Sequence, residues 1–134
     1  MKKVFNFTLI IAFVLAIAFT GCKKYDNGPS FSLMSKKARV AGTWKFKSVI
    51  YDGTDETEGW VGVEWKFSKD GDFKSIEDGF VDLGTWDFAS DKEEIDLTYG
   101  GDTYRSTIKR LTNKEMWLEG NYDGDIYTMK LTAK

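Results

Sequence analysis

Most of the chain after Gly42 alternates between apolar and polar residues. Apolar side chains recur at every second position in short runs, and residues such as Asp, Asn and Gly separate the runs. A period of two is typical of β-strands, because successive side chains point to opposite faces of a sheet. The pattern predicts eight strands, at 43–51, 60–68, 72–77, 81–88, 94–99, 103–111, 115–121 and 126–132.

The connections between these strands are too short for helical crossovers. Parallel neighbours need a crossover of a dozen or more residues, so successive strands here should pair antiparallel. Asp70-Gly71 and Asp123-Gly124 are suited to tight turns between them. The predicted fold class is all-β: an eight-stranded antiparallel up-and-down β-barrel, whose closure removes exposed sheet edges. A short N-terminal helix, capped by Ser35 and ending near Val40, should precede the barrel, with Leu33 and Ala38 on its inner side.

The phase of each strand predicts which side chains face the interior. In the first strand these are Trp44, Phe46, Ser48 and Ile50, whereas Trp60 and Trp117 fall on the outer face of later strands. Small inner residues are where an eight-stranded barrel can keep free volume, since larger side chains just fill it. The small inner residues are Ser48, Ser75, Gly84, Ser106 and Gly120.

The N-terminal segment has the pattern of a secretory leader. Lys2 and Lys3 precede an unbroken apolar run at 9–19, which is too short to span a bilayer and fits a signal peptide. The residues before Cys22, Phe19-Thr20-Gly21, resemble the lipobox of bacterial lipoproteins. That resemblance implies cleavage after residue 21 and lipidation of Cys22, with residues 22–35 as a flexible tether. The alternative is an ordinary secretory signal with an incidental cysteine.

Lipidation of Cys22 implies a membrane partner. Two or three acyl chains anchor a protein stably, whereas one gives marginal binding. Lys23 follows the anchor in place of the aspartate that retains many lipoproteins in the inner membrane. The resemblance therefore implies a cell-envelope lipoprotein of the outer membrane, facing either the periplasm or the surface.

Composition excludes several function classes. Removal of residues 1–21 takes away Lys2 and Lys3, which leaves 17 basic and 21 acidic residues and a side-chain charge of −4. Nucleic-acid binding needs a basic surface, so nucleic acid is not an expected partner. The chain has no histidine and one cysteine, which removes histidine-dependent catalysis and the usual zinc and haem ligands. We expect no cofactor and no bound metal, although the acidic loop 52–58 carries carboxylates that calcium could use.

Several segments after residue 36 resemble lipocalin-like domains. Gly42-Thr43-Trp44 matches the Gly-x-Trp that opens the first strand of lipocalins. Segments 67–73, 84–86, 108–112 and 116–118 are similar to later strands of the lipocalin-like domains found in Bacteroidota lipoproteins. The resemblance covers residues 36–134 and implies that Trp44 packs at the closed barrel end against a late cationic residue. The candidates for that partner are Arg105, Arg110 and Lys130.

Three function classes follow from these observations. We expect a non-catalytic binding module that takes a small apolar ligand, with an inner aromatic set as its candidate site. An alternative is a module that binds protein or glycan through its outer surface and loops, with Trp60 and Trp117 exposed. A hydrolase with paired carboxylates is the third class, and the oligomeric state is left open. The candidate ligand-binding residues are Trp65, Phe67, Trp86, Tyr104 and Tyr127, beside the structural residues Gly42 and Trp44.

The lipoprotein interpretation predicts the behaviour of a Cys22→Ala variant. Without the thiol there is no site for the lipid, so the variant should be either unanchored or uncleaved with its leader attached. Membrane fractionation combined with mass measurement of the protein distinguishes these states. A variant that partitions into membranes as a correctly processed, mature-length chain would contradict the interpretation.

Overall fold

The computed structural model describes residues 33–134. The predicted signal peptide, Cys22 and most of the tether lie outside the described residues. Among those that are described, no helix has the length and apolar character needed to cross a membrane.

The described chain forms one short helix, two 3₁₀ turns and nine strands. The helical elements are α2 (Lys36–Val40), η1 (Thr57–Trp60) and η2 (Ser90–Lys92). The strands are β1 (Gly42–Tyr51), β2 (Thr54–Asp55), β3 (Glu64–Phe67), β4 (Asp72–Glu77), β5 (Phe80–Ala89), β6 (Glu94–Tyr99), β7 (Asp102–Leu111), β8 (Glu115–Tyr122) and β9 (Asp125–Ala133).

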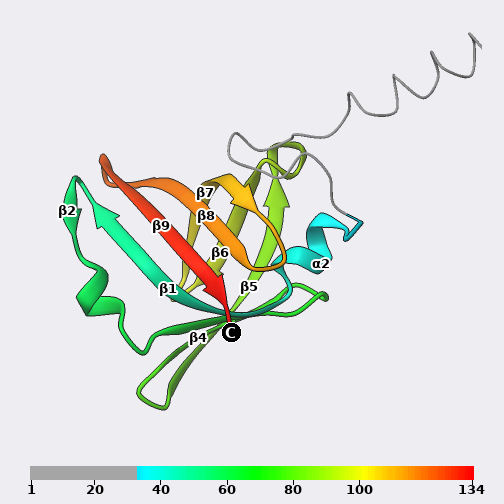
Figure 1. The fold of residues 1–134 in the computed structure, drawn as a ribbon, viewed down its shortest axis with the longest axis horizontal. Coiled ribbons are helices and arrows are strands. Elements are labelled where there is room, and N and C mark those ends of the chain that lie inside the picture. The colour runs from blue at the N-terminus through cyan, green and yellow to red at the C-terminus, as the bar shows by residue number, and fades with distance from the viewer. Residues whose placement is uncertain (1–32) are drawn as a thin grey trace, which may run out of the picture.

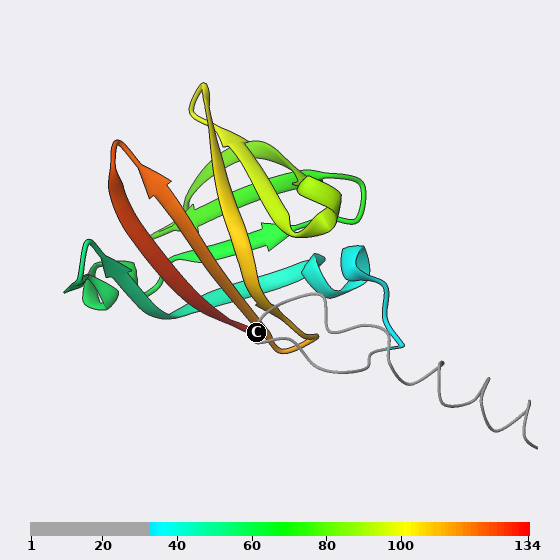
Figure 2. The same cartoon turned by 90° about the horizontal axis from the view of Figure 1, so that it is seen from above.

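The strands form a closed antiparallel barrel (Figures 1 and 2). Each strand from β3 to β8 pairs with the next along the chain, and β1 pairs with both β3 and β9. The two-residue β2 pairs only with the C-terminal end of β1, at Ile50 and Tyr51. Asp78-Gly79 and Asp123-Gly124 join their strands with positive φ at both residues, as two-residue hairpin turns require. The predicted eight-stranded up-and-down barrel is thus confirmed.

A β-bulge in β1 changes which side chains face inward. The register with β9 shifts between Phe46 and Ser48, so the extra residue reverses the alternation beyond it. Val49 is 2% exposed and Tyr51 lines the interior, in place of the predicted Ser48 and Ile50. The sequence prediction for these two inner positions was wrong. A bulge shifts the alternation by one residue but leaves no mark in the composition of the strand, so the pattern of apolar residues does not reveal it.

The segment predicted as the start of the second strand is not a strand. Residues Thr57–Trp60 form η1, and β3 begins only at Glu64. Val61 is therefore 78% exposed, whereas the alternation placed it inside. Trp60 also departs from its predicted outward position, since its ring packs against Phe46 at a centroid distance of 4.6 Å.

The helix α2 lies at the closed end of the barrel, where the chain leads into β1 (Figure 2). Ser35 caps it as predicted, and its hydroxyl accepts a hydrogen bond from the amide of Ala38 at 3.1 Å. Val40 is buried, but Leu33 is 91% exposed, which corrects its predicted inner position. Leu33 lies before the N-cap, so the helix does not orient it.

Aromatic and aliphatic side chains fill the closed end. Trp44 is 1% exposed, and its indole N–H donates to the carbonyl of Val40 at 2.8 Å. Arg39 reaches from α2 to the carbonyl of Leu111 at 2.9 Å. The cationic residues proposed for Trp44 lie elsewhere: Arg105 pairs with Asp96 on the outside. Arg110 and Lys130 flank the Trp117 ring at 5.5 and 4.4 Å. The closed-end core, as we use the term, is Val40, Trp44, Phe67, Phe73, Trp86, Ile95, Ile108, Leu111, Met116, Leu118 and Leu131.

Burial of Trp44 predicts a large effect of its truncation. Trp44→Ala should cost about 3–5 kcal/mol of unfolding free energy, because it leaves a cavity and removes the bond to Val40. Urea denaturation followed by far-ultraviolet circular dichroism measures this loss. Trp117→Ala is the matched control and should cost clearly less, since Trp117 lies on the outer face between two flexible cations. An unchanged midpoint for Trp44→Ala would contradict the assignment.

Candidate functional site

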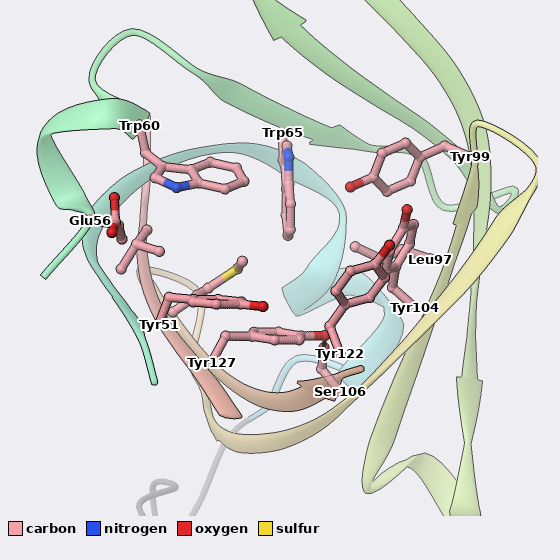
Figure 3. A pocket seen from close by; sticks show the side chains of 12 residues that line it. Tyr51, Glu56, Trp60, Trp65, Leu97, Tyr99, Tyr104, Ser106, Tyr122 and Tyr127 are labelled. Carbon is pink, nitrogen blue, oxygen red and sulfur yellow. Dashed lines mark hydrogen bonds between the residues drawn. The ribbon is translucent and has the colours of Figure 1, made fainter. Parts of the chain in front are cut away.

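The other end of the barrel is hollow. It holds a cavity of about 360 Å³, and Figure 3 shows the surrounding side chains converging on an open centre. The strands β1, β3, β6, β7, β8 and β9 and the connection after β1 all contribute to the wall. The lining residues are Val49, Tyr51, Glu56, Trp60, Trp65, Leu97, Tyr99, Tyr104, Ser106, Tyr122, Tyr127 and Met129.

One wall of the cavity depends on how the loop after β1 folds back. The amide of Glu56 donates to the carbonyl of Val49 at 2.9 Å, and the hydroxyl of Thr57 accepts from the amide of Val49 at 3.0 Å. These bonds tie the loop to β1 and place η1 over the wall. As a result, Trp60 stands edge-on to Trp65 with ring centroids 6.3 Å apart, a favoured aromatic geometry.

The opposite wall is a row of tyrosines from three strands. The ring centroids of Tyr99 and Tyr104 are 5.0 Å apart, and those of Tyr104 and Tyr122 are 5.7 Å apart. Tyr99 also contacts Phe73 at 5.4 Å, which joins the row to the closed-end core. Loss of contact with water raises the pKa of Tyr99 and of Tyr104, so both phenols are neutral near pH 7.

The floor of the cavity carries a buried pair of hydroxyls. Ser106 is 4% exposed and Tyr127 is 8% exposed, and their oxygens are 3.0 Å apart. One hydroxyl hydrogen makes this bond, which leaves the second available for a guest. A Cβ added at Gly120 would lie 2.2 Å from the Tyr127 hydroxyl, so the Tyr127 ring takes the space beside that glycine.

At the mouth, Tyr51 binds a carboxylate. Its hydroxyl donates to Asp125 at 2.9 Å, which fixes the phenol at the rim. This hydrogen bond raises the pKa of Tyr51 above its usual value, and the charges of Asp125 and Asp123 act in the same direction. The lining therefore offers neutral hydroxyls, aromatic faces and one carboxylate, that of Glu56.

The family of the chain follows from comparison with known proteins. The family model described as a lipocalin-like domain matches residues 40–118, which is more than half of the chain. The chain belongs to the lipocalin-like domain family. The match ends within β8, and β9 completes the barrel of this lipocalin-like domain by pairing with β1. A search of curated proteins finds no match.

The structure of the lipocalin-like domain separates the five predicted ligand-binding residues into two groups. Trp65, Tyr104 and Tyr127 line the cavity together. Phe67 and Trp86 instead pack in the closed-end core, with ring centroids 5.7 Å apart and 2% and 4% exposure. All five face inward, but the sequence does not give the height of each residue along the barrel axis.

Sequence reasoning missed several lining residues. By alternation, Leu97, Tyr99 and Met129 fall on the inner face of their strands, but they were not among the predicted ligand-binding residues. Val49 and Tyr51 were hidden by the bulge in β1. Trp60 was hidden by the 3₁₀ turn that replaces a strand.

The small inner residues do not create the cavity of this lipocalin-like domain. A Cβ at Gly84 would lie 2.2 Å from the carbonyl oxygen of Thr98, so backbone closely approaches that glycine. Of the five small residues, only Ser106 lines the cavity. The free volume arises instead because large aromatic side chains stand around the mouth and do not meet at its centre (Figure 3).

The other candidate sites do not assemble in the described part of the chain. Within residues 33–134, no group of three or more acidic, cysteine or histidine residues is arranged to hold a metal ion. Trp60 and Trp117 do not form a shared surface, since Trp60 lines the cavity while Trp117 packs between Arg110 and Lys130. In the described region, Ser106 and Tyr127 bring buried hydroxyls together, and no carboxylate there is buried.

Proposed function

We propose that this chain is a membrane-anchored lipoprotein of the Bacteroidota type whose barrel is a non-catalytic binding module for a small ligand with an apolar body. The observation that carries this function is the aromatic cavity at the open end. Its volume of about 360 Å³ lies at the lower end of the range for small-molecule sites, roughly 300–1,000 Å³.

The lining suits a guest held mainly by burial of apolar surface. Trp60, Trp65, Leu97, Val49 and Met129 provide the apolar contacts, at about 25 cal/mol per Å² removed from water. The Ser106–Tyr127 pair at the floor supplies the small number of placed polar groups that fix the orientation of a guest. A rigid apolar guest with one acceptor at its inner end fits this distribution.

The anchor and the cavity are compatible in space. Residues 33–41 lead into β1 at the closed end, so the mouth lies at the end of the barrel away from the tether. A lipid on Cys22 would hold the closed end toward the membrane and leave the mouth toward the aqueous compartment. The proposed location is the outer membrane, because Lys23 stands in place of the aspartate that retains many lipoproteins in the inner membrane. Ligand would then enter from solution.

A surface function is the second candidate, and one observation favours it. Strand β5 pairs with β6 only from Gly84 onward, so the hairpin of β4 and β5 extends past the barrel with one free edge. Phe80 and Leu83 on this hairpin are 80% and 69% exposed. Exposed apolar groups beside an unpaired strand edge are typical of protein-binding surfaces.

A cavity-filling variant tests the proposed function. Met129→Trp should reduce the affinity for the neutral apolar probe N-phenyl-1-naphthylamine by tenfold or more, because the indole occupies the space of the guest. The probe's fluorescence increase reports binding. Ile126→Trp is the matched control: it lies on the same strand, is 56% exposed on the outer face, and should bind the probe normally.

The same assay distinguishes the two candidate functions. Thermal unfolding first establishes that each variant is folded. If Met129→Trp binds the probe as the unaltered protein does, while Phe80→Ser loses it, the hairpin is the binding surface and the cavity proposal fails. If the folded, unaltered protein does not bind the probe at all, the cavity does not accept apolar guests.

A further inference from the structure

The mouth of the barrel and its closed end differ in charge. Four chain segments surround the mouth: the connection 48–63 after β1, the hairpin tip 75–83, the turn 98–104 and the turn 119–129. Each of these segments contains at least one Asp or Glu, and none contains Lys or Arg. The connections at the closed end, in contrast, carry both signs of charge, with Lys69, Lys92 and Lys114 beside Asp70, Asp91 and Glu93.

The acidic groups at the mouth act directly on the cavity. Glu56 is part of its lining, and Asp125 accepts the hydrogen bond of Tyr51 at 2.9 Å. Burial raises the pKa of Tyr99 and of Tyr104, and the charges of Asp82 and Asp102, respectively, act in the same direction. The negative charges are therefore distributed around the rim rather than on one side.

The rim also offers aromatic faces to a cation. Trp60 and Tyr51 stand near Glu56 at one side of the opening, and Tyr104 and Tyr122 stand at the other (Figure 3). Aromatic faces attract ammonium groups through the ring quadrupole, and tryptophan does so most strongly. A ligand with a carboxylate at the rim would face several negative charges. No lysine or arginine is among the lining residues to pair with it.

We propose that the ligand of this cavity is cationic: an organic ammonium group held at the acidic rim, with its apolar body inserted between Trp65, Leu97 and Met129. This inference rests on the proposed function and specifies its ligand class. A cavity with one sign of charge and apolar walls concentrates ions of the opposite sign. The same field disfavours fatty acids and other apolar anions.

A probe series with a constant body isolates the charge. Adamantane is compact, does not form micelles and does not absorb where tryptophan emits. We would titrate the full-length or mature protein by calorimetry with 1-adamantyltrimethylammonium, 1-adamantanol and 1-adamantanecarboxylate at neutral pH. The ammonium probe should bind at least about tenfold more tightly than the carboxylate at low salt. The ratio should shrink at about 0.5 M salt, because screening shortens the range of the field.

A matched pair of double variants locates the effect at the mouth. Glu56→Gln with Asp82→Asn should reduce the ratio of ammonium to carboxylate affinity severalfold. Asp70→Asn with Glu93→Gln removes the same charge from the closed end and should leave the ratio nearly as it was. An equal effect of both pairs would mean that overall charge, not the rim, sets the preference, and would overturn the proposal.

The outcomes separate this proposal from the one on which it rests. If all three probes bind with similar affinity, the cavity binds apolar guests but the charge preference is refuted. If the carboxylate binds most tightly, the proposal is likewise overturned. If none of the three binds, then the cavity function itself fails.

Discussion

The hydrogen-bonded seam between β1 and β9 determines the architecture. It pairs seven residues of β1 with β9, from Trp44 opposite Ala133 to Tyr51 opposite Tyr127, and so closes the sheet. On its other side β1 pairs with β3 over only four residues, Gly42 to Lys45. Beyond Lys45 the wall between β1 and β3 is open, and η1 covers it with Trp60. The mouth and its aromatic wall thus both follow from the unequal pairing of one strand.

The two ends of the barrel differ in how their side chains pack. The closed end is packed with side chains that are nearly inaccessible, among them Trp44, Phe73 and Leu131, and it resembles the interior of any small domain. The mouth keeps its large side chains apart. Trp65 and Leu97 belong to both regions, since they pack on the closed-end core and also line the cavity. Under the proposed function, changes at the rim would alter the choice of ligand while the closed end maintains the fold.

The sequence predicted the fold well because alternation and turn residues are local. Strands β4 and β6 have the predicted bounds, and most others differ by one or two residues at an end. The bulges were not predictable in this way. In β1 and β7 an extra residue, near Lys47 and Lys109, reverses which side chains point inward beyond it, and the composition of the strand does not reveal this. The largest error, the strand predicted from Trp60, arose because Thr57 and Val49 make hydrogen bonds that no local pattern reveals.

The site was harder to predict than the fold, because it depends on height along the barrel axis. Phe67 and Trp65 both lie on the inner face of β3, yet only Trp65 reaches the cavity. The reasoning that small residues leave free volume also failed at Gly84 and Gly120, where a backbone carbonyl and the Tyr127 ring take the space. The asymmetry of charge, however, is already present in the sequence and becomes visible once the turns are assigned to the two ends.

The central claim is that this domain has a packed end and a hollow end that accepts an apolar guest. Three of its four methionines report on the two ends directly, since Met129 lines the cavity, Met116 is fully buried in the closed-end core and Met34 is exposed. In a spectrum of protein labelled at the methionine methyl groups, titration with 1-adamantanol should shift the Met129 signal in a saturable way and leave Met116 and Met34 in place. Equal shifts of all three signals, or no shift of Met129 at saturating probe, would contradict the account.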